Sequence, residues 1–389
     1  MTRVFDRRVL ATALALAVAG ILLIGAQTRA SRLSADFTID YSAGLLIREG
    51  RLAAVYDQAQ LAEVLQRFAP NGAINPQLPF NKPLAAALPY TLLSLLPIEM
   101  AFRVWQAISA GLLFLMLVLL QRVLPLGSRA LSFGTLGLLA AVPTAATFDE
   151  GQITPLLALG AALMIASLRA KSLPLAMTAG ALLAVKPQYL PAYLVLCLAA
   201  RAWRPLLAAA VGGTVVLLSP LLGGWDNLAM MVHQAVAANQ VVDVRLNEAW
   251  IGVLGALVPA AALTAVAIAT FLMVHAVMGV LAWRRPTNLT AFAALAGMLG
   301  VLASPHALPH DLLILAVPAW LAVGVYRDGK LPNPMPVLVL ADLALLIDLK
   351  GFGVPVAPIV LTAGLAWLVW QFQQRTGSQR QPPIITKAA

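Results

Sequence analysis

The stretch Asp36-Phe37-Thr38-Ile39-Asp40-Tyr41 opens the longest polar interval of a sequence that is otherwise strongly apolar. If this stretch is helical, Asp36 and Asp40 lie one turn apart and face the same side of the helix. One interpretation is a general base that takes a proton from an attacking hydroxyl group. The other is that Asp36 caps a helix while Asp40 is simply solvated. The spacing alone leaves both open.

On either side of that stretch the composition is that of a membrane protein. Of 389 residues, 61% are hydrophobic and only 11% are charged, whereas a soluble domain carries roughly 25% charged residues. Apolar runs of about 15–25 residues recur from end to end, which is the length that spans a bilayer as a helix. The alternating pattern of an outer-membrane barrel is absent. We therefore expect an all-α, polytopic transmembrane helical bundle that forms a single domain over residues 1–389.

The net charge of +10 does not indicate a nucleic-acid-binding protein. The arginines stand at the ends of apolar runs rather than in one tract, as the positive-inside rule requires. The single cysteine, Cys197, excludes an intramolecular disulfide and a cysteine-based metal site. Glycine-rich phosphate loops and the HExxH and GxSxG motifs are missing, so soluble nucleotide chemistry is unsupported. We expect no cofactor and no metal.

The charges also predict a topology in the cell membrane. Arg3, Arg7 and Arg8 precede the apolar run 9–26 and hold the start of the first span in the cytoplasm. Residues 27–99 or so form a long first outer loop with amphipathic helices in the membrane interface. The run Leu84–Leu96, between two prolines, is short for a span and is read as interfacial or re-entrant. About 12 spans (about 10–13) result, with both termini and a tail near 372–389 in the cytoplasm.

The later spans follow from the apolar runs. They are expected near residues 100–121, 130–146, 153–168, 173–185, 188–200, 205–222, within 250–283, 289–303, 312–325, 334–348 and 354–370. With this topology the cytoplasmic loops are rich in Arg and Lys, whereas the short outer loops hold only Lys186, Arg245 and Lys350. Every unusual polar cluster then falls on the outer side, which predicts a one-sided site.

Two of these polar clusters lie between the expected spans. Asp149-Glu150-Gly151-Gln152 precedes an apolar run, where two acids suit the N-terminus of a helix. Gln152, at the membrane boundary, is read as a hydrogen-bonded structural residue unless it belongs to a site. Lys186-Pro187 interrupts apolar sequence, so Lys186 either snorkels to the interface or meets an anion such as a phosphate in a cavity.

The late segment 304–311 carries His306 and His310 four residues apart, between prolines. The prolines make a regular helix unfavourable, and nearby glutamates that would complete a zinc site are missing. Contact with a phosphate or support of a carboxylate base is therefore the favoured interpretation for the two histidines.

Taken in order, these motifs resemble glycosyltransferase family 87, of the membrane-embedded GT-C class, which includes polyprenol-phosphate-mannose-dependent α-mannosyltransferases. Each motif is short, and it is their joint order and shared side of the membrane that carry the resemblance, from about residue 35 to about residue 315. The residues concerned are Asp36-Phe37, Tyr41, Ala43, Gly50, Val55-Tyr56-Asp57, Lys82-Pro83-Leu84, Pro97, Gly151-Gln152-Ile153, Lys186-Pro187, Ser304-Pro305 and His310-Asp311.

The resemblance implies transfer of a mannose-like hexose or a pentose from a polyprenyl-phosphate donor to a hydroxyl of a lipid or glycan acceptor, on the extracytoplasmic side. It assigns the catalytic base to Asp36, with Asp40 as the fallback, and a supporting role to His310. Residues expected to bind the substrates, above all the donor phosphate, are Lys82, Arg103, Gln152, Lys186, Arg245, His306 and Asp311.

Two other functions use similar features. A transporter or flippase of a lipid-linked saccharide also needs many spans and basic outer groups, but usually has polar residues in mid-helix or broken, repeated helices. A polysaccharide polymerase or ligase is expected to have its large outer loop late in the chain. Here the middles of the spans are mostly Leu, Ala and Val, and the large loop comes first. Both features favour the transferase.

Overall fold

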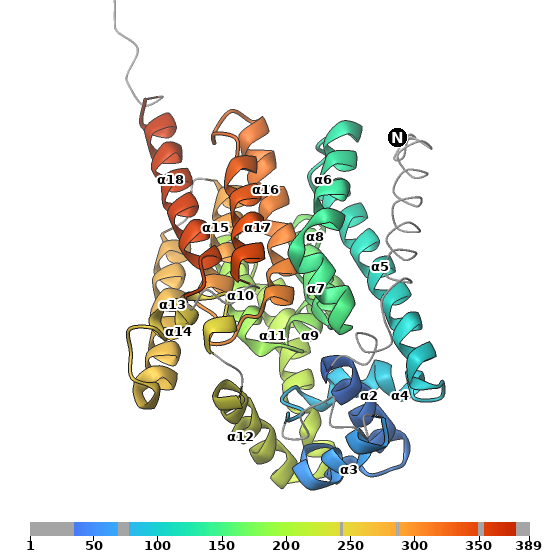
Figure 1. The fold of residues 1–389 in the computed structure, drawn as a ribbon. Coiled ribbons are helices and arrows are strands. Elements are labelled where there is room, and N and C mark those ends of the chain that lie inside the picture. The colour runs from blue at the N-terminus through green and yellow to red at the C-terminus, as the bar shows by residue number, and fades with distance from the viewer. Residues whose placement is uncertain are drawn as a thin grey trace, which may run out of the picture.

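The computed structural model describes residues 35–68, 78–241, 244–284, 286, 288–348 and 354–378. Over these residues the chain is all-α and contains no strand, as the composition predicts. The expected first span near residues 9–26 lies outside the described residues, as do residues 379–389 of the expected tail. The long helices run side by side, while α2, α3 and α12 gather at one end of the bundle, called here the Asp36 end (Figure 1).

The helices follow the apolar runs of the sequence, separated by Pro, Gly and charged residues. In chain order they are α2 (Ala35–Arg48), η1 (Leu52–Tyr56), α3 (Gln58–Phe68), η2 (Leu84–Ala87), α4 (Leu88–Leu93), α5 (Ile98–Val123), α6 (Ser128–Ala140), α7 (Val142–Glu150), α8 (Thr154–Ala170), α9 (Leu173–Leu183), η3 (Pro187–Tyr189), α10 (Leu190–Ala199), α11 (Trp203–Leu217), η4 (Ser219–Gly223), α12 (Trp225–Val241), η5 (Val244–Leu246), α13 (Trp250–Leu254), α14 (Ala260–Trp283), α15 (Leu289–Leu302), η6 (Pro309–Leu315), α16 (Ala316–Arg327), α17 (Met335–Asp348) and α18 (Ala357–Ser378).

Several of these helices are apolar enough to cross a membrane. Four segments of the described chain have both the length and the hydropathy, namely Ile98–Val123, Trp203–Gly223, Ala261–Trp283 and Pro309–Arg327. Other apolar helices, such as α8 and α15, are shorter. The prediction of a polytopic helical membrane protein is thus confirmed in outline, and the count of about 12 spans stays a prediction.

One expected span is divided in two. Residues 130–146 were expected to form one helix, but α6 ends at Ala140 and α7 begins at Val142, with Ala141 in extended conformation. Pro143 is the cause, because it has no N–H to donate to the preceding turn and its ring clashes with the helix there. As a result α7 starts in a new direction and runs on to Glu150, four residues beyond the expected end.

The middle of the bundle is held by close helix contacts. Helix α9 packs against both α8 and α11. A Cβ atom on Gly180 would lie 2.0 Å from the carbonyl oxygen of Ala209, and one on Gly212 would lie 2.0 Å from that of Met177. Small residues at such a contact let two backbones approach closely, which is the main source of helix association in lipid.

Helix α2 is packed against neighbouring helices, and its expected position in the membrane interface stays a prediction. Phe37, at 0% exposure, packs edge-on against Tyr90 of α4 and Phe102 of α5. The Tyr41 hydroxyl donates to the carbonyl oxygen of Leu96 at 2.7 Å, and the Arg48 guanidinium donates to that of Ser94. These contacts fix the helix that carries both candidate carboxylates.

A buried carboxyl pair joins distant parts of the bundle. Glu248 is 1% exposed, between η5 and α13, and lies within hydrogen-bonding reach of Asp348. Asp348 in turn accepts from the backbone N–H groups of Val356 at 2.7 Å and Ala357 at 2.8 Å, at the start of α18. Burial, with a further contribution from Asp348, raises the pKa of Glu248 to about 9. Glu248 is therefore protonated at neutral pH and can donate to Asp348.

We expect this pair to make the stability of the protein depend on pH. Because the folded state holds a proton that the unfolded state releases above about pH 4.5, stability falls as pH rises towards about 9, by at most about 1.4 kcal/mol per pH unit. Glu248→Gln keeps a donor for Asp348 and removes the titration. The melting temperature of this variant, relative to that of the wild type, should increase as pH rises. A difference in melting temperature that is the same at every pH would contradict the assignment.

Candidate active site

A cavity of about 280 Å³ opens at the Asp36 end of the bundle. Its walls come from α2, the segment 78–82, the turn between α7 and α8, the break at Lys186-Pro187 and the segment before η6. The sequence thus brings together polar residues that are up to 274 positions apart. Those of the predicted site residues that line this cavity are Asp36, Asp40, Lys82, Gln152, Lys186, His306 and His310.

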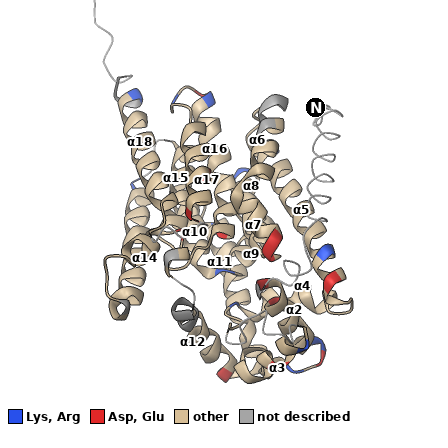
Figure 2. Ribbon diagram, viewed as in Figure 1, with Lys and Arg blue, Asp and Glu red and all other residues tan. Residues whose placement is uncertain are grey.

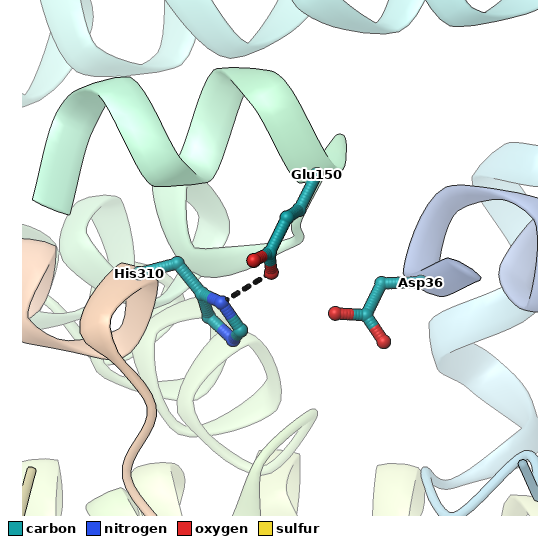
Figure 3. A group of neighbouring side chains, drawn as sticks. All are labelled: Asp36, Glu150 and His310. Atoms are coloured by element: carbon teal, nitrogen blue, oxygen red, sulfur yellow. Dashed lines mark ion pairs between the residues drawn. The ribbon is translucent and has the colours of Figure 1, made fainter. Parts of the chain in front are cut away.

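Asp36 lies in the first turn of α2 with its carboxylate aimed into the cavity (Figure 3). Gln152, 2% exposed, donates its side-chain N–H to Asp36. The main chain of Gln152 is fixed as well. Its main-chain N–H donates to the carbonyl oxygen of Thr147 at 3.0 Å, and its main-chain carbonyl oxygen accepts from the Trp105 indole at 3.3 Å. Gln152 is therefore hydrogen-bonded and also lines the cavity, and its role in binding substrate stays a prediction.

Gly151 makes this placement of Gln152 feasible. Its φ of +61° lies in the left-handed region, and an added Cβ atom would come within 2.7 Å of Phe102 and 2.9 Å of Phe37. Only glycine meets both conditions without cost. The turn between α7 and α8 consequently lies against α2 and α5, with Glu150 on one side of Gly151 and Gln152 on the other.

Opposite Asp36, His310 of η6 and Glu150 of α7 form an ion pair with 2.6 Å between His310 Nδ1 and Glu150 Oε2 (Figure 3). The main-chain carbonyl of His310 also accepts from Thr147 of α7 at 3.2 Å. One ligand-type atom from each of Asp36, Glu150 and His310 lies within 4.8 Å of the other two. A carboxylate from the start of the chain thus faces a carboxylate–imidazole pair from the middle and the end.

The surroundings shift the pKa values of the two carboxylates in opposite directions. Burial raises the pKa of Asp36, and the neighbouring His310 only partly opposes this effect. For Glu150 burial also acts upwards, but His310 and the hydrogen bonds around the carboxylate outweigh it and the pKa is lowered. A buried carboxylate with a raised pKa binds a proton more readily than an ordinary aspartate, which suits a general base.

Glu150 was not among the predicted site residues. The sequence pattern predicts two acids before a helix start, whereas Asp149 and Glu150 are the last residues of α7 and α8 begins only at Thr154. A carboxylate is disfavoured by the dipole at a helix C-terminus. The signal that could have found Glu150 is the glycine at 151, which marks a helix end, and the partner that keeps the acid there is His310.

The two lysines of the cavity each pair with a carboxylate. Lys82 Nζ lies 2.7 Å from both carboxylate oxygens of Asp40, which is 1% exposed. Lys186 Nζ lies 2.5 Å from Asp311 Oδ1 in a second buried pair. Because both oxygens of Asp40 are engaged by Lys82, Asp36 is the less encumbered of the two aspartates. Both ammonium groups still line the cavity, and their binding of phosphate stays a prediction.

Three further predicted residues differ in their relation to the cavity. His306 lines the cavity, but burial lowers the pKa of this histidine to about 4. Its imidazole is therefore neutral at pH 7 and offers no positive charge to a phosphate. Arg103 does not line it, and instead donates to Gln106 at 2.8 Å along α5. Arg245 lies in the short turn η5, and its side chain is outside the described structure.

The same cluster has the composition of a metal site, with two carboxylates and one imidazole. In the structure His310 Nδ1 and Glu150 Oε2 face each other at ion-pair distance, 2.6 Å apart. The arrangement as it stands is suited to holding and moving protons. The expectation of no metal stays a prediction.

An all-α bundle with membrane-spanning helices and a carboxylate–imidazole cluster in an end cavity defines a membrane-embedded enzyme. Comparison with known families gives the second step: the model of glycosyltransferase family 87 matches residues 80–305. The chain belongs to that family and is a membrane glycosyltransferase. The match includes Gln152 and Lys186, begins after Asp36 and ends before His310. No curated protein and no solved structure matches the chain.

Proposed function

We propose that the protein transfers a sugar from a polyprenyl-phosphate donor to a hydroxyl group of a lipid or glycan acceptor, in the cavity at the Asp36 end. The observation that carries the proposal is the half-buried Asp36 carboxylate, held by Gln152 and facing a cavity that is also lined by two lysines. A base and a set of cations in one cavity is what displacement of a phosphate by a hydroxyl requires.

In this reaction the oxygen of the acceptor hydroxyl forms a bond to the anomeric carbon of the sugar. Asp36 accepts the proton that this hydroxyl loses. The bond between that carbon and the phosphate oxygen breaks, and its electron pair leaves with the polyprenyl phosphate. Lys186 and Lys82 lie where they can stabilise the developing charge. His310, held by Glu150, faces Asp36 and partly offsets the effect of burial on the pKa of that carboxylate.

The proposal also places the cavity on the extracytoplasmic side. Lys and Arg stand at the ends of α16 and α18 that lie away from α2 (Figure 2). Arg169, Lys171, Arg201 and Arg204 likewise lie at that opposite end, at the ends or starts of α8 to α11. Short basic loops favour the cytoplasm. The Asp36 end then faces outwards, where lipid-linked sugar donors are used.

A transfer assay tests the donor class. Purified protein in lipid nanodiscs is given radiolabelled polyprenyl-phosphate mannose, glucose or a pentose, together with a membrane lipid extract as the source of acceptor. The same sugars are supplied in parallel as nucleotide conjugates. We expect labelled product from a lipid-linked donor only. Transfer from a nucleotide sugar at an equal or greater rate would contradict the proposal.

A further inference from the structure

A second, larger cavity of about 870 Å³ lies at the opposite end of the bundle, and the proposed reaction does not use it. It is formed by the ends of α5, α8 and α10 and by the beginnings of α9, α11 and α15. Most of its walls are apolar, with side chains such as Leu168, Leu196 and Leu289. Its described lining includes four basic residues and no carboxylate; the four are Arg169, Lys171, Arg201 and Arg204.

Two of these basic residues have an unfavourable backbone conformation. Lys171 follows α8 with φ of 52°, and Arg201 follows α10 with φ of 54°. Within the described chain they are the two non-glycine residues with positive φ. Glycine is the residue that ordinarily ends a helix in this conformation, because it has no Cβ atom to clash. Lys171 and Arg201 thus place a positive charge at the ends of α8 and α10, at positions where glycine would be less strained.

Arg201 is held in place but not neutralised. Its guanidinium donates to the carbonyl oxygen of Trp283 at 2.5 Å and stacks on the ring of that residue, 4.4 Å from the centroid. Its Nε is buried and has no hydrogen-bond partner among the described residues. Arg204 stands in the first turn of α11, where the positive end of the helix dipole adds to its own charge. This side of the cavity is therefore short of an anion.

We propose that this cavity binds an anionic phospholipid of the membrane, with its phosphate against Arg201 and Arg204 and an acyl chain along the apolar wall. A free phosphate would satisfy only the basic side, whereas an amphiphile complements both. Trp203, which lines the cavity and is 48% exposed, is of the type that lies at the headgroup level of a bilayer. The occupant is thus a membrane lipid, distinct in place from the sugar donor.

Native mass spectrometry of the purified protein tests this proposal. The protein is titrated with phosphatidylglycerol, with phosphatidylcholine of the same acyl chains, or with inorganic phosphate. We expect one phosphatidylglycerol to bind in preference to phosphatidylcholine, and inorganic phosphate not to displace it. Equal binding of the two lipids, or displacement by equimolar inorganic phosphate, would overturn the proposal.

Variants locate the lipid. The double substitution R201Q/R204Q should weaken phosphatidylglycerol binding by at least about tenfold, since each basic residue near a headgroup is worth about fivefold. The matched control R122Q/K330Q removes two exposed basic residues that do not line the cavity. It should leave binding within about twofold of the wild type. An equal loss in both variants would show general surface attraction and overturn the site.

Lys171→Gly distinguishes binding from folding. Glycine relieves the positive φ, so the melting temperature should rise, while loss of one charge weakens phosphatidylglycerol binding by about fivefold. A purely structural role of Lys171 cannot give both changes. Unaltered lipid binding in this variant, together with unaltered binding in R201Q/R204Q, would contradict the proposal even if either variant were less stable.

Discussion

Asp36→Asn is expected to lower the rate of sugar transfer by about 10³-fold or more while leaving the protein folded. The amide cannot accept the proton of the acceptor hydroxyl, but it has the same shape and can still accept the hydrogen bond from Gln152. Because burial disfavours the charged form of Asp36, removing the charge should not lower the melting temperature. Turnover with a lipid-linked donor and the melting temperature are measured on the same preparation.

Asp40→Asn is the matched control for that experiment. Asp40 is one turn along α2 and carries the same side chain, but it neutralises the buried Lys82. Breaking a buried ion pair by removing one partner costs about 3–5 kcal/mol. We therefore expect Asp40→Asn to be chiefly a stability variant, and Asp36→Asn to be chiefly a rate variant. Near-normal transfer by folded Asp36→Asn would exclude Asp36 as the base.

His310→Gln is expected to move the acid limb of the pH profile of kcat/KM to higher pH. That limb reports the protonation of the base in the free enzyme. The interaction with His310 lowers the pKa of Asp36, so its loss lets burial raise that pKa further. Activity below the limb therefore falls, and the maximal rate falls as well, by about tenfold to a hundredfold, because Glu150 loses its partner.

The control for this prediction is His306→Gln. His306 lines the same cavity, but its imidazole is already neutral at pH 7. Replacing it should leave the acid limb in place, whatever it does to the rate. A limb that stays put in His310→Gln, or that moves equally in both variants, would show that His310 does not act on Asp36 electrostatically.

Much of the site could be predicted because local patterns encode it. The i, i+4 spacing of Asp36 and Asp40 fits helix α2, which carries both, and the polar breaks at Gln152, Lys186 and 304–311 line or adjoin one cavity. Hydropathy identified an all-α membrane protein, since a lipid environment leaves few alternatives for the backbone.

Pairings between distant segments could not be predicted in the same way. The partners Lys82–Asp40 and Lys186–Asp311 are 42 and 125 residues apart in the sequence, and no local spacing indicates which charge meets which. Glu150 was missed because its role depends on where α7 ends, and that depends on Pro143 and Gly151 acting together. The burial of α2 likewise follows from its fit against α4 and α5, not from its own pattern.

Chemical rescue tests the assignment of the base most directly. Asp36→Ala and Asp40→Ala are assayed for sugar transfer from a lipid-linked donor in rising concentrations of formate, which can enter the space left by the missing carboxylate. We predict that formate accelerates transfer by Asp36→Ala, in proportion to its concentration, and has no such effect on Asp40→Ala. Transfer by Asp36→Ala at the wild-type rate without formate, or rescue of Asp40→Ala instead, would contradict the role of Asp36 as the general base.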